Sequence, residues 1–307
     1  MARDSTPPHD FSTKTLLVAG GGGFIGATVT HAALKAGFGT VVSLGRQARH
    51  TAGTPRLRHI VLDLTDPAAT SAFFQKHSFD YILNLAGRID QSTTPGIWQR
   101  QLEANLRTTL NLAEAFACGA NGRFIQVGSG MEYGRAPCPA TPDGPAMPVS
   151  AYGMSKLAAS QLVLAKAHSE GFPGLVARLF SVYGPNQPPT AFLAAALAAA
   201  KAGRDFDTTA GGQTRDFTPA AKIAGELLEL CALPAADAIG RVFNLCTGVE
   251  LSLRRTLEIF QEEHPGFAPH FGALPYRPTE LMRSAGTPFR PWTPTQAENA
   301  LRDFART

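Results

Sequence analysis

Short apolar runs alternate with amphipathic stretches along the chain up to about residue 180. Runs with the character of strands lie at Thr15–Ala19, Thr40–Leu44, His59–Leu62, Tyr81–Leu85, Arg123–Val127 and Leu175–Leu179. Stretches with helical periodicity lie between most of them, at Phe24–Gly37, Ala68–His77, Trp98–Cys118 and Ser155–Ser169. Strands that alternate with helices of this length predict a parallel sheet covered by helices on both faces. The expected fold class is therefore α/β with a doubly wound sheet, in which ligands bind at the carboxyl ends of the strands.

The pattern becomes less regular beyond Tyr183. A loop rich in Gly and Pro is followed by an alanine-rich helix at Ala191–Ala202, and prolines then punctuate Pro265–Pro294. This texture predicts a smaller C-terminal lobe packed against the strand ends. We expect residues 13–180, with roughly 216–248 returning to the sheet, to form the larger domain. Residues 181–215 and 249–307 would form the smaller lobe.

Composition and charge narrow the class of protein. The chain has 307 residues, of which 44% are hydrophobic and 17% charged, as in an ordinary globular protein. A net charge of +4 with only one local basic cluster argues against a nucleic-acid partner. The four cysteines have neither CxxC pairing nor zinc-like spacing, so we expect free thiols and no metal site. The N-terminus lacks the apolar core of a signal peptide and Ala191–Ala202 is too short to span a bilayer, which predicts a soluble, cytoplasmic protein without a membrane partner.

Four consecutive glycines separate the first apolar run from the first helical stretch. Within Gly20-Gly21-Gly22-Gly23-Phe24-Ile25-Gly26, three of the glycines have the spacing G-x-x-G-x-x-G. The first permits a tight turn, the second lets the backbone approach a pyrophosphate, and the third brings the helix against the strand. The helix N-terminus then points its free N–H groups at the phosphates. A glycine turn can also merely connect two elements, but its position between a strand and a helix favours a Rossmann-type dinucleotide site.

The end of the second predicted strand bears on which dinucleotide is bound. Sites for NAD usually carry Asp or Glu there, to bind the ribose hydroxyls. This chain reads Gly45-Arg46-Gln47 without an acid, and an arginine fork suits a ribose 2′-phosphate. NADP(H) is therefore favoured, while NAD(H) stays possible because Arg46 could lie in a solvated loop. Asp63, at the end of the third strand, is placed either to contact the adenine or to cap the turn that follows.

Tyr152 and Lys156 are four residues apart in a stretch of helical character, so both side chains lie on one face of the helix. A phenol is too weak an acid to exchange protons readily near neutral pH, and a neighbouring ammonium is expected to lower its pKa. The spacing Y-x-x-x-K also occurs by chance on protein surfaces. Here it follows a glycine turn and several strand–helix units, which indicates an acid–base pair.

These residues make the chain resemble the extended short-chain dehydrogenase/reductase family over nearly its whole length. The resemblance depends on the glycine turn, Asp63-Leu64, Asn84-Leu85-Ala86-Gly87, Asn105, Gly128-Ser129-Gly130-Met131-Glu132-Tyr133-Gly134, Tyr152 with Lys156, Arg178-Leu179-Phe180-Ser181, Arg215-Asp216-Phe217 and Arg277-Pro278. It implies that Tyr152 exchanges a proton with the substrate oxygen, which Ser129 positions. Lys156 would contact the nicotinamide ribose and tune Tyr152.

The resemblance also implies the contacts of the cofactor and the substrate. With the residues discussed above, the expected cofactor contacts are Gly20, Gly23, Phe24, Ile25, Gly26, Arg46, Asp63, Leu64, Leu85, Ala86, Gly87, Asn105, Tyr152, Lys156 and Phe180. The expected substrate contacts are Ser129, Met131, Glu132, Tyr152, Ser181, Arg215 and Arg277, with a structural role as the alternative for Glu132. The two arginines would hold the diphosphate of a nucleotide-diphosphate sugar. A homodimer formed through Trp98–Cys118 and Ser155–Ser169 is expected, unless their apolar faces are covered within one chain.

Two absences distinguish between reactions within this family. Related 4,6-dehydratases carry an acidic pair directly after the serine position, where this chain has Gly130 and Met131. Enzymes that epimerise beside a ketone carry a cysteine at the position of Met131. The expected reaction is therefore NADPH-dependent reduction of a 4-keto-6-deoxy nucleotide sugar, with the branch that reduces GDP-4-keto-6-deoxymannose as the nearest likeness. An NAD-dependent nucleotide-sugar 4-epimerase stays open, as does a non-catalytic NADP-binding sensor or scaffold.

Overall fold

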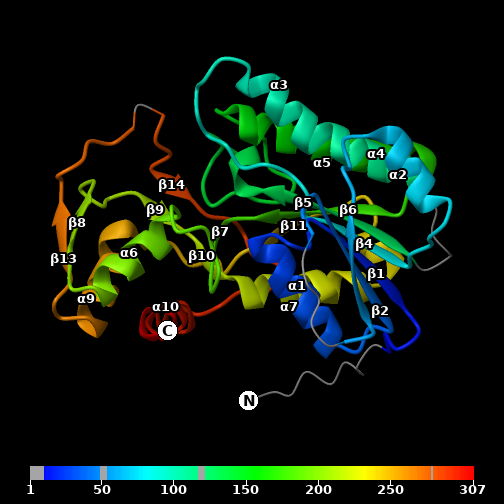
Figure 1. Ribbon diagram of the computed structural model, residues 1–307. Coiled ribbons are helices and arrows are strands. Elements are labelled where there is room, and N and C mark those ends of the chain that lie inside the picture. The colour runs from blue at the N-terminus through cyan, green and yellow to red at the C-terminus, as the bar shows by residue number, and fades with distance from the viewer. Residues whose placement is uncertain (1–9, 49–53, 117–121, 278) are drawn as a thin grey trace.

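In the part of the chain that the computed structural model describes, residues 10–48, 54–116, 122–277 and 279–307, seven parallel strands form one sheet (Figure 1). In spatial order they are β3 (Leu57–Val61), β2 (Thr40–Gly45), β1 (Thr15–Ala19), β4 (Tyr81–Asn84), β5 (Arg123–Ser129), β6 (Gly174–Leu179) and β11 (Val242–Leu245). The strand order reverses between β1 and β4, and such a reversal places a ligand crevice at the carboxyl ends of the strands. This arrangement confirms the doubly wound α/β fold.

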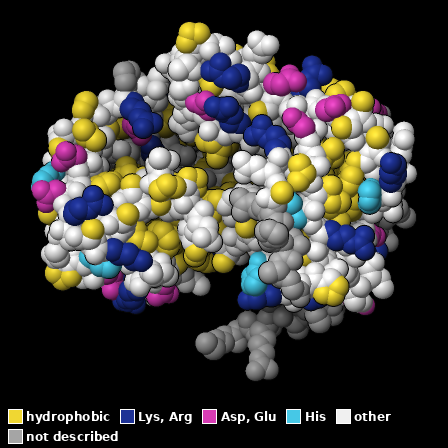
Figure 2. All heavy atoms as spheres, viewed as in Figure 1, with side chains coloured by type: hydrophobic (Ala, Val, Ile, Leu, Met, Phe, Trp, Pro, Cys, Tyr) yellow, Lys and Arg dark blue, Asp and Glu magenta, His cyan; other side chains and the backbone are white. Residues whose placement is uncertain are grey.

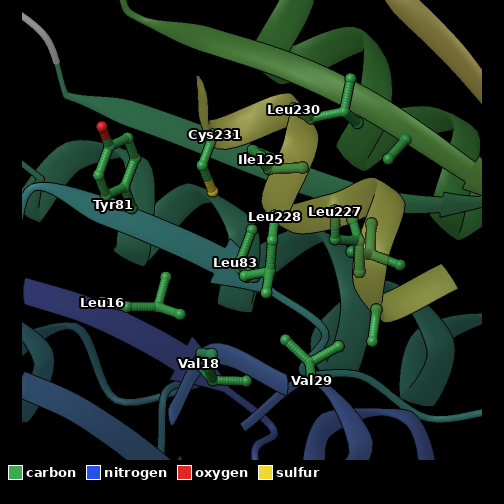
Figure 3. Close-up of a cluster of buried hydrophobic side chains, with 14 of the residues drawn as sticks. Leu16, Val18, Val29, Tyr81, Leu83, Ile125, Leu227, Leu228, Leu230 and Cys231 are labelled. Carbon is green, nitrogen blue, oxygen red and sulfur yellow. The ribbon is translucent and has the colours of Figure 1, made fainter. Parts of the chain in front are cut away.

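Alternate residues of β1 face opposite sides of the sheet, as a strand period of two requires. Leu16 and Val18 join a core that also includes residues of α1 (Phe24–Lys35) and α7 (Ala220–Ala232) (Figure 3). Leu17 and Ala19 belong to the core on the other face. Because both faces are buried, the strands read as continuous apolar runs in the sequence.

The second face of the sheet is covered by α2 (Pro67–Phe74), α4 (Thr108–Ala115) and α5 (Ala151–Glu170) (Figure 1). The long helix predicted over Trp98–Cys118 is divided into α3 (Ile97–Gln101), the π-helical segment η1 (Leu102–Arg107) and α4, and Cys118 lies outside the described residues. Helix α5 begins four residues before the predicted Ser155, because the Ser150 hydroxyl caps it by accepting a hydrogen bond from the Gly153 N–H at 3.1 Å. This early start places Tyr152 in the first turn.

The smaller lobe has its own core, which includes Tyr183, Leu257 and Phe304. Its strands are short: β7 (Ser181–Tyr183), β8 (Asp205–Thr208), β9 (Thr214–Arg215), β10 (Phe217–Pro219), β12 (Leu251–Ser252), β13 (Ala268–Phe271) and β14 (Arg283–Ser284). Its helices are α6 (Phe192–Lys201), α9 (Leu253–Glu263) and α10 (Pro294–Arg306), while α8 (Ala235–Ala238) precedes β11. The sequence predicted only an irregular lobe here, since strands of two to four residues carry no readable period.

Within the described ranges, no helix is both long enough and apolar enough to cross a membrane. The same residues include no group of three or more His, Cys, Asp or Glu side chains placed to hold a metal ion.

Candidate active site

The glycine turn lies between β1 and α1, and its geometry requires glycine. Gly20 has φ +77°, in the left-handed region. A Cβ added at Gly26 would lie 2.2 Å from the Gly20 carbonyl oxygen, so the third glycine brings helix and strand together. The N-cap residue of α1 is Gly23, which offers no side chain to the N–H groups of Phe24, Ile25 and Gly26. This helix N-terminus fits the pyrophosphate of a dinucleotide.

The loop after β2 carries the residues expected to distinguish NADP from NAD. Arg46 is exposed there, and its charge contributes to lowering the pKa of Asp63. His59 on β3 supports this loop through contacts with the Ser43 hydroxyl at 3.0 Å and the Gln47 carbonyl oxygen at 2.8 Å. Asp63 accepts hydrogen bonds from the N–H and hydroxyl of Thr65, and these two bonds are the main cause of the lowered pKa of its carboxyl, with the charge of Arg46 a smaller one. Asp63 therefore caps the turn, the second of the two roles considered from the sequence.

The turn after β4 is stabilised by hydrogen bonds to the side chain of Asn105, which belongs to η1. Asn105 Oδ1 accepts the Arg88 N–H at 3.0 Å, and the side-chain amide nitrogen of Asn105 donates to Ser155 Oγ at 2.8 Å and Gln101 Oε1 at 2.9 Å. A Cβ at Gly87 would lie 2.3 Å from Asn105 Oδ1. The side chain of Asn105 is thus engaged by protein groups and shapes the turn at Leu85, Ala86 and Gly87, while its contact with the cofactor stays a prediction. Leu64 is buried in the core on this face of the sheet.

Ser129, Tyr152 and Lys156 come together at the carboxyl end of β5. Ser129 is the last residue of β5, and Tyr152 and Lys156 lie on α5. Helix α5 approaches this strand end closely because residue 153 is glycine: a Cβ there would lie 2.5 Å from the Met131 carbonyl oxygen. The Lys156 ammonium donates to the Val127 carbonyl oxygen at 2.9 Å. The Ser129 hydroxyl oxygen accepts the Met131 N–H at 3.2 Å.

Burial dominates the electrostatics of this group. It raises the pKa of Tyr152 to about 12, although the hydrogen bond from Ser129 opposes the rise. It also lowers the pKa of Lys156 to about 8, since an ammonium loses its hydration there. The lowering of the Tyr152 pKa by Lys156 that was expected from the sequence is therefore not the main effect. Near neutral pH the phenol keeps its proton, which suits a group that donates one.

A cavity of about 340 Å³ opens above these residues, where the molecule is hollowed between the two lobes (Figure 2). Ser129, Tyr152, Met131, Phe180, Ser181, Arg215 and Arg277 all line it. The guanidinium of Arg215 pairs with Glu280 and donates to the Leu281 carbonyl oxygen at 2.8 Å. Arg277 is exposed, and the adjoining Pro278 lies outside the described residues. The cavity therefore has an acid–base group on its floor and two arginines on the side of the smaller lobe.

Glu132 does not line this cavity, and the predicted contact with substrate is contradicted. Its side chain is fully buried, and its carboxylate accepts hydrogen bonds from Arg178 Nε at 2.7 Å and the Ser129 N–H at 2.8 Å. The segment after Ser129 is a single 3₁₀ turn, η2 (Gly130–Glu132). The turn rotates Glu132 into the protein, so the alternative structural role is the one observed.

Several cavity residues escaped the sequence interpretation. They are Ile89, Gln91, Val149, Ser150, Thr279, Glu280, Leu281 and Ser284. Glu280 follows Arg277 by three residues, and an acid so close to a predicted phosphate-binding arginine was a usable signal. Ile89 and Gln91 follow the Gly87 turn in a loop without any period, which gave no signal.

Comparison with known proteins adds independent information. The model of the NAD dependent epimerase/dehydratase family matches residues 16–246. The chain is 31% identical to dTDP-6-deoxy-L-talose 4-dehydrogenase (NAD(P)(+)) of Kitasatospora kifunensis, over 92% of this chain and 86% of that protein. It is 33% identical to GDP-6-deoxy-D-mannose reductase of Pseudomonas aeruginosa, over 60% of this chain and 62% of that protein.

Solved structures agree in fold. UDP-glucuronic acid 4-epimerase from Bacillus cereus, in complex with UDP-glucuronic acid and NAD, matches with a TM-score of 0.81 and 21% identity, over 95% of this chain and 99% of that chain. At that identity the likeness shows the fold alone. The family match covers the glycine turn and Ser129, Tyr152 and Lys156, so the chain belongs to the NAD-dependent epimerase/dehydratase family of extended short-chain dehydrogenases/reductases and is an NAD(P)-dependent enzyme.

Proposed function

We propose that this enzyme reduces the ketone at position 4 of a 4-keto-6-deoxy nucleotide sugar with NADPH. The observation that carries the proposal is the cavity in which Ser129 and Tyr152 lie opposite Arg215 and Arg277. A sugar ketone would reach the hydroxyl groups while a diphosphate reaches the arginines, since guanidinium groups bind phosphate well. The cavity thus has the two chemical characters that a nucleotide sugar needs.

The residues around the glycine turn fit a dinucleotide, and Arg46 favours NADP over NAD. Gly20, Gly23 and Gly26 would hold the pyrophosphate at the start of α1, and Lys156 would bind the nicotinamide ribose. The exposed guanidinium of Arg46 would pair with the 2′-phosphate. When bound, NADPH supplies the hydride.

The chain's own residues supply the proton and the orientation. Ser129 Oγ donates a hydrogen bond to the ketone oxygen and fixes its position. Tyr152 Oη gives its proton to the same oxygen as that oxygen becomes a hydroxyl group. Because burial raises the pKa of Tyr152 to about 12, the phenol is protonated before each turnover. Met131, beside Ser129 in the cavity, has no acid or thiol, which disfavours water elimination and epimerisation at a neighbouring carbon.

The names of the two relatives support redox chemistry on a 6-deoxy nucleotide sugar, and the first name gives position 4. One is named a 4-dehydrogenase of a dTDP-6-deoxy sugar and the other a reductase of a GDP-6-deoxy sugar. A 4-dehydrogenase working in reverse reduces a 4-ketone. The nucleotide base is left open by these two names, so substrates with GDP and dTDP both belong in the test.

A 4-epimerase is the second candidate, because UDP-glucose 4-epimerase of Streptomyces lividans is 26% identical over 93% of this chain. The two reactions are separated by incubating the purified protein with NADPH and GDP- or dTDP-linked 4-keto-6-deoxyhexoses. Loss of NADPH absorbance with formation of a 6-deoxy nucleotide sugar supports the reductase. Interconversion of nucleotide-sugar epimers by protein that carries tightly bound NAD, without net oxidation, refutes it. NADP binding without any turnover would indicate a sensor or scaffold.

We also propose that two copies of the chain pair through the helical layer formed by α3, η1 and α5. Trp98, Leu102 and Met154 are 56%, 37% and 43% exposed on these elements, which leaves apolar area for a partner. A Trp98→Glu variant should be a monomer by sedimentation velocity where the wild-type protein is a dimer. A wild-type monomer at micromolar concentration refutes this pairing.

A further inference from the structure

A buried carboxylate lies directly behind the catalytic strand end. Glu132 Oε1 accepts hydrogen bonds from the Ser129 N–H at 2.8 Å and the Ser160 hydroxyl at 3.0 Å. Its Oε2 accepts one from Arg178 Nε at 2.7 Å. The side chain of Glu132 is 0% exposed and that of Arg178 is 3% exposed. Taking such a pair out of water is costly, so its retention beside the active site calls for an explanation.

The three partners of Glu132 belong to three elements of the active site. Ser129 ends β5 and carries one catalytic hydroxyl, while Arg178 lies on the neighbouring strand β6. Ser160 lies on α5, one helical turn after Lys156 and two turns after Tyr152. One carboxylate therefore joins the strand that carries Ser129 to the helix that carries the proton donor. The space is tight, because a Cβ at Gly128 would lie 2.4 Å from Glu132 Oε1.

We propose that Glu132 is the positioning residue of this active site. Its carboxylate fixes the Ser129 backbone against α5 and places a negative charge behind Tyr152 and Lys156. This inference rests on the proposed function only in taking Ser129, Tyr152 and Lys156 as the catalytic group. It holds for reduction and for epimerisation alike, since both reactions need the same proton transfer.

The charged and titratable groups around the Glu132 carboxylate determine how its removal would change the pKa values in the site. Arg178 faces it from β6, and the Arg178 guanidinium lies 4.4 Å from the centre of the Tyr133 ring. The Tyr133 hydroxyl in turn donates to Asn244 Oδ1 on β11 at 2.7 Å. On the α5 side, burial is the larger effect on both groups: it raises the pKa of Tyr152 and lowers the pKa of Lys156. The negative charge of Glu132 adds to the rise for Tyr152 and opposes the fall for Lys156. Without that negative charge, both groups lose their protons at lower pH.

The test compares Glu132→Gln, which keeps the length and removes the charge, with Glu132→Asp, which keeps the charge and shortens the side chain. Both should lower kcat about 10- to 100-fold, because a small misplacement of a catalytic hydroxyl costs that much. The KM of the sugar and the Kd of NADPH should change less than about twofold, since neither ligand touches Glu132. In Glu132→Gln, the alkaline limb of the kcat profile should move to lower pH, whereas in Glu132→Asp it should stay in place.

Glu226→Gln is the matched control, because Glu226 is also a buried acid paired with a basic side chain, Lys222, but lies on α7. It should lower the melting temperature without changing kcat per active site or the pH profile. The kcat of each variant is compared with that of the wild-type enzyme in whichever nucleotide-sugar reaction the wild-type enzyme catalyses. A wild-type epimerase would therefore refute the proposed reduction and still test Glu132.

Two outcomes would overturn the inference. One is a Glu132→Gln protein with wild-type kcat and an unmoved alkaline limb. The other is a loss of kcat that disappears when rates are expressed per folded site, as counted by NADPH binding. If Glu132→Gln does not fold, Glu132→Asp and Ser160→Ala decide, because wild-type kcat in both folded variants would equally remove Glu132 from its role.

Discussion

Replacing Arg46 tests how this enzyme chooses its dinucleotide. Arg46 is exposed, so the free energy of its bond to a 2′-phosphate would be small for a bond between charged groups. Arg46→Ser should therefore weaken NADPH binding about tenfold. Arg46→Asp should weaken it about tenfold more at low salt, because a carboxylate then faces the phosphate. The same carboxylate can accept hydrogen bonds from the ribose hydroxyls of NADH. The ratio of kcat/KM for NADPH to that for NADH should thus fall about 100-fold or more in Arg46→Asp.

The control for Arg46 is Arg56, an arginine of the same β2–β3 connection that donates to the Phe38 carbonyl oxygen, at 3.3 Å. Phe38 precedes β2, so this guanidinium points toward the amino end of the sheet and away from the glycine turn. Arg56→Ala removes the same charge and should leave both affinities within about twofold of wild type. Fluorescence titration of NADPH at two salt concentrations gives the measurement. Unchanged NADPH affinity in both Arg46 variants would refute the assignment of NADP through the second strand.

Three further experiments probe the remaining parts of the site. Tyr152→Phe should lower kcat about 100-fold or more and leave NADPH binding intact, because only the proton donor is lost; normal turnover in this variant would exclude Tyr152 as the acid. Gly26→Ala should weaken NADPH binding and cost about 1–3 kcal/mol of folding free energy, since its Cβ would lie 2.2 Å from the Gly20 carbonyl oxygen. The control is Gly225→Ala, whose Cβ would have nothing within 4 Å and which should be neutral or stabilising by thermal melting. Because burial lowers the pKa of Lys156 to about 8, its ammonium is present below that pH and lost above it. The kcat/KM for NADPH should therefore fall as the pH rises through about 8. A flat profile there would show that the charge of Lys156 is not required.

The central strands of the sheet were predictable because they are buried on both faces. The apolar run Thr15–Ala19 coincides with β1, whereas α5 begins after the Ser150 cap, four residues before the start predicted at Ser155. The interruption of the predicted Trp98–Cys118 helix was not predictable, since the π-helical segment is stabilised by contacts distant in sequence. Asn105 in that segment bonds Arg88 and Ser155, which are 17 and 50 residues away. Local propensity contains no information about such partners.

The proximity of Ser129, Tyr152 and Lys156 was predictable for a different reason, namely that the proposed chemistry needs particular residue types at fixed spacings. Tyr152 and Lys156 share a helix face, and Gly20, Gly23 and Gly26 share one turn. The substrate side has no such constraint. Arg215 meets Glu280 across 65 residues of sequence, through strands too short to show a period. The sequence therefore identified both arginines of the cavity but gave no indication that one of them is already paired.

For Glu132, the direction of the side chain differs from the one that the local sequence pattern predicts. Treated as extended chain, the segment after Ser129 would point Glu132 to the face opposite the serine. Yet Ser129 and Glu132 have the S-x-x-E spacing of a capping box, in which the glutamate carboxylate accepts the serine N–H and the serine hydroxyl accepts an N–H of the helical turn that follows. In this box the Ser129 hydroxyl accepts the Met131 N–H, while the carboxylate turns inward to Arg178. The same three-residue turn thus holds the Ser129 hydroxyl at the cavity and buries the charge behind it, so the positioning role proposed for Glu132 and the catalytic role proposed for Ser129 depend on one conformation.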